Sequence, residues 1–76
     1  MKRKGLQHRL GEVIRAQRAA LGHSQESYAD AIGLHRNYVG GIERGERNVS
    51  LQNLERLAEG LGLRLSELLV KAERSV

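Results

Sequence analysis

The sequence contains no cysteine and no proline, and none of its apolar runs exceeds three residues. Without cysteine no disulfide can form, which suits a reducing cytoplasm. The three histidines (His8, His23 and His35) lack the spacing of metal ligands, so we expect no metal and no other cofactor. A membrane helix needs about 20 apolar residues, and the Met-Lys-Arg-Lys start lacks the apolar stretch of a signal peptide. These absences predict a soluble, cytoplasmic protein that does not bind membranes.

The chain has 76 residues, so we expect one domain over residues 1–76, with a basic tail at residues 1–5. A chain of this size buries only about 60% of its unfolded surface. Because neither a disulfide nor a metal supplements so small a core, we expect the protein to gain stability as a homodimer.

The net charge of +4 suggests an anionic partner, but the excess is not spread along the chain. The first 24 residues hold six Lys or Arg and one acidic residue. Residues 25–49 hold three Lys or Arg and four acidic residues, and residues 50–76 hold four basic and four acidic residues. The basic start (Lys2, Arg3 and Lys4) fits a solvated tail as well as an arm that reaches DNA.

Helical periodicity runs through the whole chain, with no alternating pattern of the β type, which predicts an all-α fold. Serine caps and glycine stops divide the pattern into five helices. We expect them at residues 6–21, from Ser24 to Gly33, at residues 36–44, from Ser50 to Gly62, and at residues 65–73. Tyr28 is expected in the core, with its hydroxyl reaching the surface.

Residues 24–50 contain two short helices joined by a glycine turn and followed by a basic loop. Such a unit can lay its second helix in the DNA major groove. The segment resembles the helix-turn-helix domains of the phage repressor, Cro and XRE type, and more closely the restriction–modification controller proteins and their orphan relatives. The resemblance spans about residues 10–69 and implies a compact five-helix, lambda-repressor-like fold. It is carried by Arg18, Gln25, Ala29, Gly33, Ile42, Glu43 and Gly45.

The start of the third helix holds the candidates for reading DNA bases. Arginine pairs bidentately with guanine and asparagine with adenine, so Arg36 and Asn37 suit direct readout. The resemblance to controller-type relatives implies that Tyr38 faces DNA, although its ring could also help to fill the bundle.

Five further residues are candidates for phosphate contacts. The resemblance implies that Gln25, in the first turn of the second helix, clamps a phosphate. His35 stands at a cap position where histidine is a poorer cap than serine, so we expect it to contact a phosphate instead. The others lie in the basic loop: Arg44, Arg47 and Asn48.

Gly40 and Gly41 are unusual inside a helix, where each costs roughly 1 kcal/mol relative to alanine. They could let the helix sit closer to the DNA or leave the site to be read through DNA shape. Alternatively, a neighbouring side chain packs against the bare helix backbone.

The resemblance also implies two structural features. Arg18 and Glu43 would form a partly buried ion pair between the first and third helices. The C-terminal helices would form a dimer face, with the candidates Leu63, Leu65, Leu69 and Val70. Arg64 stands where relatives often have a serine or threonine cap.

These features predict a sequence-specific transcriptional regulator that binds an inverted repeat in double-stranded DNA as a homodimer and controls its own promoter. The chain has no room for a ligand-binding domain, and its Ser, His and acidic residues are accounted for by caps, surfaces and the ion pair, so we expect neither a small-molecule ligand nor an enzyme. The alternative is an antitoxin that binds DNA and a protein toxin. A nonspecific architectural protein is a minor option.

Overall fold

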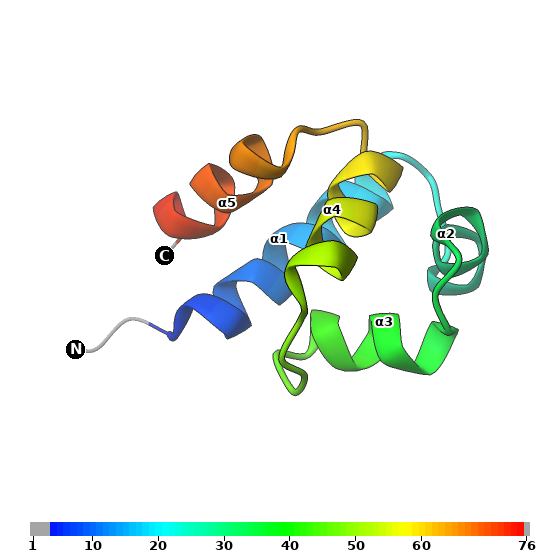
Figure 1. The fold of residues 1–76 in the computed structure, drawn as a ribbon, viewed down its shortest axis with the longest axis horizontal. Helices are drawn as coiled ribbons and strands as arrows, with labels where there is room; N and C mark the ends of the chain where they lie inside the picture. Colours follow the sequence, from blue (N-terminus) through cyan, green and yellow to red (C-terminus); the bar gives the residue numbers. More distant parts are fainter. Residues whose placement is uncertain (1–3, 76) are drawn as a thin grey trace.

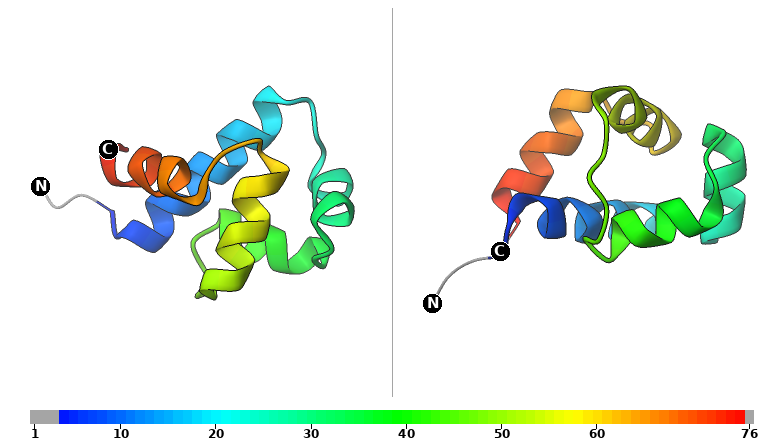
Figure 2. Two further views of the ribbon diagram at one scale, coloured as in Figure 1. Left: turned by 45° about the horizontal axis from the view of Figure 1, so that its top comes forward. Right: turned by 60° about the horizontal axis from the view of Figure 1, so that its bottom comes forward.

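The computed structural model describes residues 4–75, which form five helices and no strand (Figure 1). The helices are α1 (Leu6–Ala20), α2 (Gln25–Ile32), α3 (Arg36–Glu43), α4 (Leu51–Gly60) and α5 (Leu65–Arg74). The predicted all-α, five-helix fold is confirmed. The start of α1 and the end of α5 lie at one end of the molecule, and α2 lies at the other (Figure 2). No helix in the described range is long and apolar enough to cross a membrane.

Local signals set the helix ends close to where they were expected. The hydroxyl of Ser24 accepts from the Ser27 N–H at 3.0 Å, and that of Ser50 accepts from the Asn53 N–H at 3.1 Å. Gly33 ends α2 with φ of 72°, a conformation that glycine adopts without steric cost. α5 begins after Arg64, whose own N–H donates to the Glu67 carboxylate at 2.8 Å.

Side chains from all five helices form the core. Its largest fully buried side chains are Tyr28, Ile14, Ile42, Leu57, Leu68 and Val39. Tyr28 belongs to the core as predicted, but its hydroxyl does not reach the surface, so that part of the prediction was wrong. The hydroxyl donates to the backbone oxygen of Leu57 at 2.6 Å, a buried acceptor supplied by α4. Burial raises the pKa of Tyr28 far above that of an ordinary tyrosine.

α1 passes closest to α3 at Gly11. A β-carbon at this position would collide with the carbonyl oxygen of Ile42 and lie 2.7 Å from that of Glu43. The absence of a side chain therefore lets the two helix backbones touch, and this contact sets the position of α3.

The two ends of the described chain are held together by polar contacts. The buried Arg9 guanidinium donates to the carbonyl oxygens of Ala72 at 2.9 Å and Glu73 at 3.1 Å, at the end of α5. Lys4 pairs with Glu12 at 2.7 Å, so this member of the basic start lies against α1 rather than in a tail. Lys2 and Arg3 lie outside the described residues.

Candidate nucleic-acid interface

α2 and α3 meet through the Gly33 turn, and α3 lies along one edge of the molecule (Figures 1 and 2). His35 caps α3, because its Nδ1 accepts from the Asn37 N–H at 3.0 Å. The expectation that this histidine would contact a phosphate instead of capping α3 was therefore wrong about the cap. The ring has only Nε2 left for a phosphate, and that contact stays a prediction.

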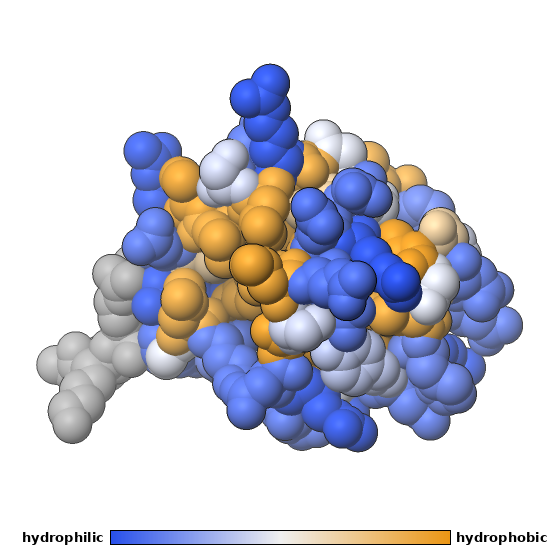
Figure 3. Space-filling view, viewed as in Figure 1, coloured by the Kyte–Doolittle hydropathy of each residue, from blue (hydrophilic) through white to orange (hydrophobic). Residues whose placement is uncertain are grey.

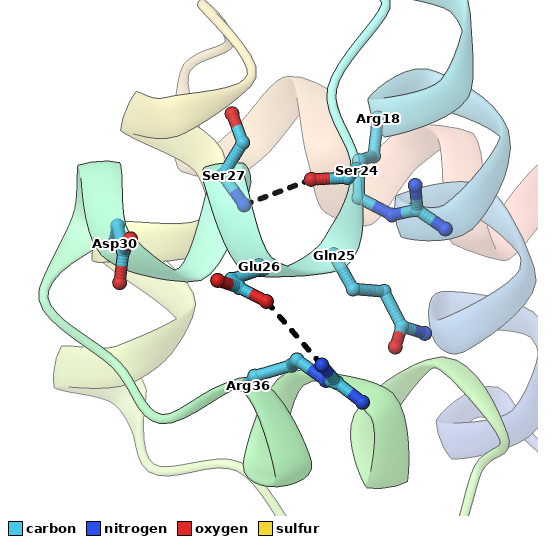
Figure 4. A pocket seen from close by; sticks show the side chains of 7 residues that line it. All are labelled: Arg18, Ser24, Gln25, Glu26, Ser27, Asp30 and Arg36. Carbon is cyan, nitrogen blue, oxygen red and sulfur yellow. Dashed lines mark hydrogen bonds and ion pairs between the residues drawn. The ribbon is translucent and has the colours of Figure 1, made fainter.

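Arg36 and Asn37 are both exposed in the first turn of α3. The guanidinium of Arg36 lies 3.3 Å from the carboxylate of Glu26 on α2, and more than half of each side chain is exposed (Figure 4). An exposed pair of this kind contributes little to stability, so Arg36 can leave Glu26 at low cost. The Asn37 side chain makes no hydrogen bond within residues 4–75.

Tyr38 is half-buried and packs against the core, so its ring does help to fill the bundle. Its hydroxyl accepts from the Asn53 side chain at 3.1 Å and thereby joins α3 to the first turn of α4. Contact with DNA stays a prediction for this residue. Sequence reasoning did not find Asn53 or Glu26, because their partners lie 15 and 10 residues away in another helix.

Behind the exposed face of α3, Arg18 forms a two-point ion pair with Glu43. The Arg18 Nε and Nη2 atoms lie 2.7 and 3.0 Å from the two carboxylate oxygens, and only 2% of the Glu43 side chain is exposed. The hydrogen bonds to Glu43 raise the pKa of Arg18. The expected pair is therefore present.

Gln25 is the third member of this group. Its Nε2 donates to the Glu43 carboxylate at 3.0 Å, which leaves one of the two amide N–H groups for an external acceptor. Gln25 also lines a shallow hollow between the start of α2 and Arg36, shown in Figure 4. A phosphate contact of Gln25 stays a prediction. The hydrogen bond to Glu43 would already orient the Gln25 side chain for that contact.

The loop after α3 carries the remaining candidates. Arg44 pairs with Glu46 at 3.1 Å, and both side chains are exposed. Arg47 and Asn48 are also exposed, and neither side chain has a hydrogen-bond or ion-pair partner in the described part of the chain.

The two glycines of α3 lie beneath these loop side chains. A β-carbon on Gly40 would lie 3.1 Å from the tip of Arg44, and one on Gly41 would lie 2.9 Å from Cγ of Arg47. Of the explanations left open by the sequence, packing of a neighbouring side chain against the helix backbone is the one seen.

The dimer-face candidates lie in and just before α5. Leu63, Leu65 and Leu69 are partly buried, and Val70 is 40% exposed. Figure 3 shows apolar surface over the region of α5 and its junction with α4. Within residues 4–75 no three His, Asp or Glu side chains gather in a way that could hold a metal ion.

The sequence pattern of the helix-turn-helix family matches residues 14–68, which include α2, α3 and α4. The chain belongs to this family. Among proteins of similar sequence, the control protein C.MunI of a Mycoplasma species is 55% identical over 51 residues, which cover 67% of this chain and 69% of the relative.

Solved structures agree with this assignment. The restriction–modification controller protein C.AhdI from Aeromonas hydrophila is 49% identical, with a TM-score of 0.78 over 80% of this chain and 92% of its own. The controller protein C.Esp1396I, solved as a tetramer in complex with its natural 35 base-pair operator, is 33% identical, with a TM-score of 0.79 over 92% and 96% of the two chains. The predicted resemblance of this helix-turn-helix protein to controller proteins is confirmed.

Proposed function

We propose that this helix-turn-helix protein is a sequence-specific transcriptional regulator that binds an inverted repeat as a homodimer and controls its own promoter. The observation that carries the proposal is the exposed first turn of α3, where Arg36 and Asn37 stand side by side. Supporting it, the similar protein C.Esp1396I has been solved with its operator.

In this proposal α3 enters the major groove and its first turn contacts base edges. Arg36 leaves Glu26 and pairs with a guanine, and Asn37 pairs with an adenine. The remaining amide N–H of Gln25 and the side chains of Arg47 and Asn48 contact phosphates, which positions α3 in the groove.

Two copies, joined through Leu63, Leu65, Leu69 and Val70, would place their recognition helices about 34 Å apart, one turn of DNA. Residues 1–76 would act as one domain in the cytoplasm. Occupancy would then depend on the concentration of the protein, which suits control of its own promoter.

The test is selection of bound duplexes from a random-sequence DNA library by the purified protein at near-physiological salt. We expect enrichment of an inverted repeat with half-sites about one helical turn apart. A library that stays unenriched while the protein binds DNA would contradict the proposal and favour a nonspecific binder.

The antitoxin alternative has no support among the similar proteins, which are described as control proteins or transcription factors. Purification of the protein from its native cells in an obligate complex with a toxin would revive it.

A further inference from the structure

We infer that Gly41 is a positioning residue for DNA binding, because its bare backbone holds the Arg47 side chain against the recognition helix. The inference rests on the proposed function and assigns a role to a residue with no side chain of its own.

The backbone of α3 does not itself require glycine at position 41. The glycines with positive φ in the described range are Gly22, Gly33, Gly45 and Gly62, and Gly41 is not among them. Alanine would also favour the helix more than glycine does. The reason for glycine therefore lies in what occupies the space beside the helix.

That space is occupied by an exposed arginine and not by the core. The three atoms nearest to a β-carbon on Gly41 would all belong to Arg47: Cγ at 2.9 Å, Nε at 3.3 Å and Cδ at 3.6 Å. At Gly60, in contrast, the nearest atoms belong to Ile32 and Tyr28, which pack in or against the core. Gly41 thus accommodates a side chain that adds little to the stability of the fold.

The backbone of the loop brings Arg47 back over the helix. The N–H of Glu46 donates to the carbonyl oxygen of Gly41 at 2.9 Å, and Gly45 adopts the left-handed conformation with φ of 76°. This turn reverses the chain immediately before Arg47 and directs its stem along the last turn of α3.

Among Arg36, Arg44 and Arg47, the last is the one without an ion-pair partner in the described part of the chain. Arg36 pairs with Glu26 and Arg44 pairs with Glu46, whereas Arg47 has no ion pair or hydrogen bond within residues 4–75. Contact with Gly41 orients its stem while all guanidinium donors stay available for a phosphate. Pre-ordering the side chain in this way lowers the entropy lost on binding.

The experiment is a double-mutant cycle on DNA binding with Gly41→Ala, Arg47→Ala and the double variant. Fluorescence anisotropy would measure affinity over a range of salt concentrations, for a duplex with the selected inverted repeat and for a scrambled duplex. Arg47→Ala should weaken both affinities about tenfold and reduce the salt slope by about 1. Gly41→Ala should lower both affinities about threefold or more, while its Tm stays equal to or above that of the wild type.

The background without Arg47 is the matched control. There, Gly41→Ala should change affinity no further, because the side chain that it displaces is already gone. An equal loss in both backgrounds would mean that the added methyl group meets DNA directly, and an unchanged affinity in the wild-type background would mean that the contact with Arg47 is irrelevant. Both results overturn the inference. Failure of the proposed function would look different, because the wild type would then bind the selected and scrambled duplexes equally.

Discussion

Arg36 is the residue whose role in recognition can be separated most cleanly from a role in folding. Its side chain is exposed and its one partner, Glu26, is exposed too, so the fold does not depend on it. Arg36→Ala should cost about 1–3 kcal/mol of binding to the selected duplex and relax specificity at one base position. Binding to duplexes with each base substituted in turn would measure this. Unchanged specificity would place the base-reading surface elsewhere.

Glu43 represents the opposite case, a charged residue whose importance is structural. It is 2% exposed at the side chain and accepts from Arg18 and Gln25. Glu43→Gln should destabilise the fold by about 3–5 kcal/mol, because it leaves the Arg18 charge without a counter-charge. Urea unfolding would measure the loss.

The exposed pair of Arg44 and Glu46 is the control for Glu43. Glu46→Gln should change the unfolding free energy by no more than about 0.5 kcal/mol. If Glu43→Gln and Glu46→Gln changed the unfolding free energy equally, burial would not explain the importance of the Arg18–Glu43 pair.

At the scale of elements, the contact between α1 and α3 depends on one missing side chain. Gly11→Ala should push the two helices apart and cost about 1–3 kcal/mol. Gly5→Ala adds the same methyl group where nothing lies within 4 Å, so it should cost only the difference between glycine and alanine at the N-cap of α1, about 0.5 kcal/mol. Thermal unfolding of the two variants would compare them, and a Gly11→Ala variant as stable as wild type would contradict the close approach.

The helices themselves could be predicted because their signals are local. Ser24 caps the start of α2, Ser50 caps the start of α4, and Gly33 ends α2. Each of these residues lies next to the helix end that it defines. The signals that failed are those that depend on a partner far along the chain. The Tyr28 hydroxyl, for example, donates to a buried carbonyl on α4. The cap formed by His35 is the exception, because its partner Asn37 is local and the prediction failed on residue type alone, since histidine is not a favoured cap.

In the candidate site, too, local features could be predicted and contacts between elements could not. Exposure of Arg36 and Asn37 could be expected from the position of a helix start. The contacts of Gln25 with Glu43, and of Arg47 with Gly41, could not, because they arise only when α2, α3 and the loop come together.

At the scale of the whole molecule, dimer formation would depend on the apolar surface of α5. Val70 is the most exposed of the four candidates, so Val70→Glu should leave the fold intact while placing a charge in the interface. Sedimentation should show a monomer at concentrations where the wild type is a dimer, and operator affinity should fall because the half-sites are no longer bound together.

A second substitution tests whether any added charge has this effect. Ala31→Glu introduces the same carboxylate at an exposed position on α2, at the other end of the molecule. It should leave self-association unchanged. A dimer that survives Val70→Glu would move the interface away from α5.

The contact of Arg9 with the last carbonyls of α5 has a consequence for how operators can change during evolution. α1 packs against both α5 and α3, and Arg9 fastens the far end of α5 to it. If α5 joins the two copies, the spacing of the two recognition helices is fixed by a rigid helix with no hinge in between. Such a protein would tolerate exchange of single bases in its operator far better than the insertion or deletion of one base pair between the half-sites, so operator and protein would diverge by substitution while the spacer length stays constant.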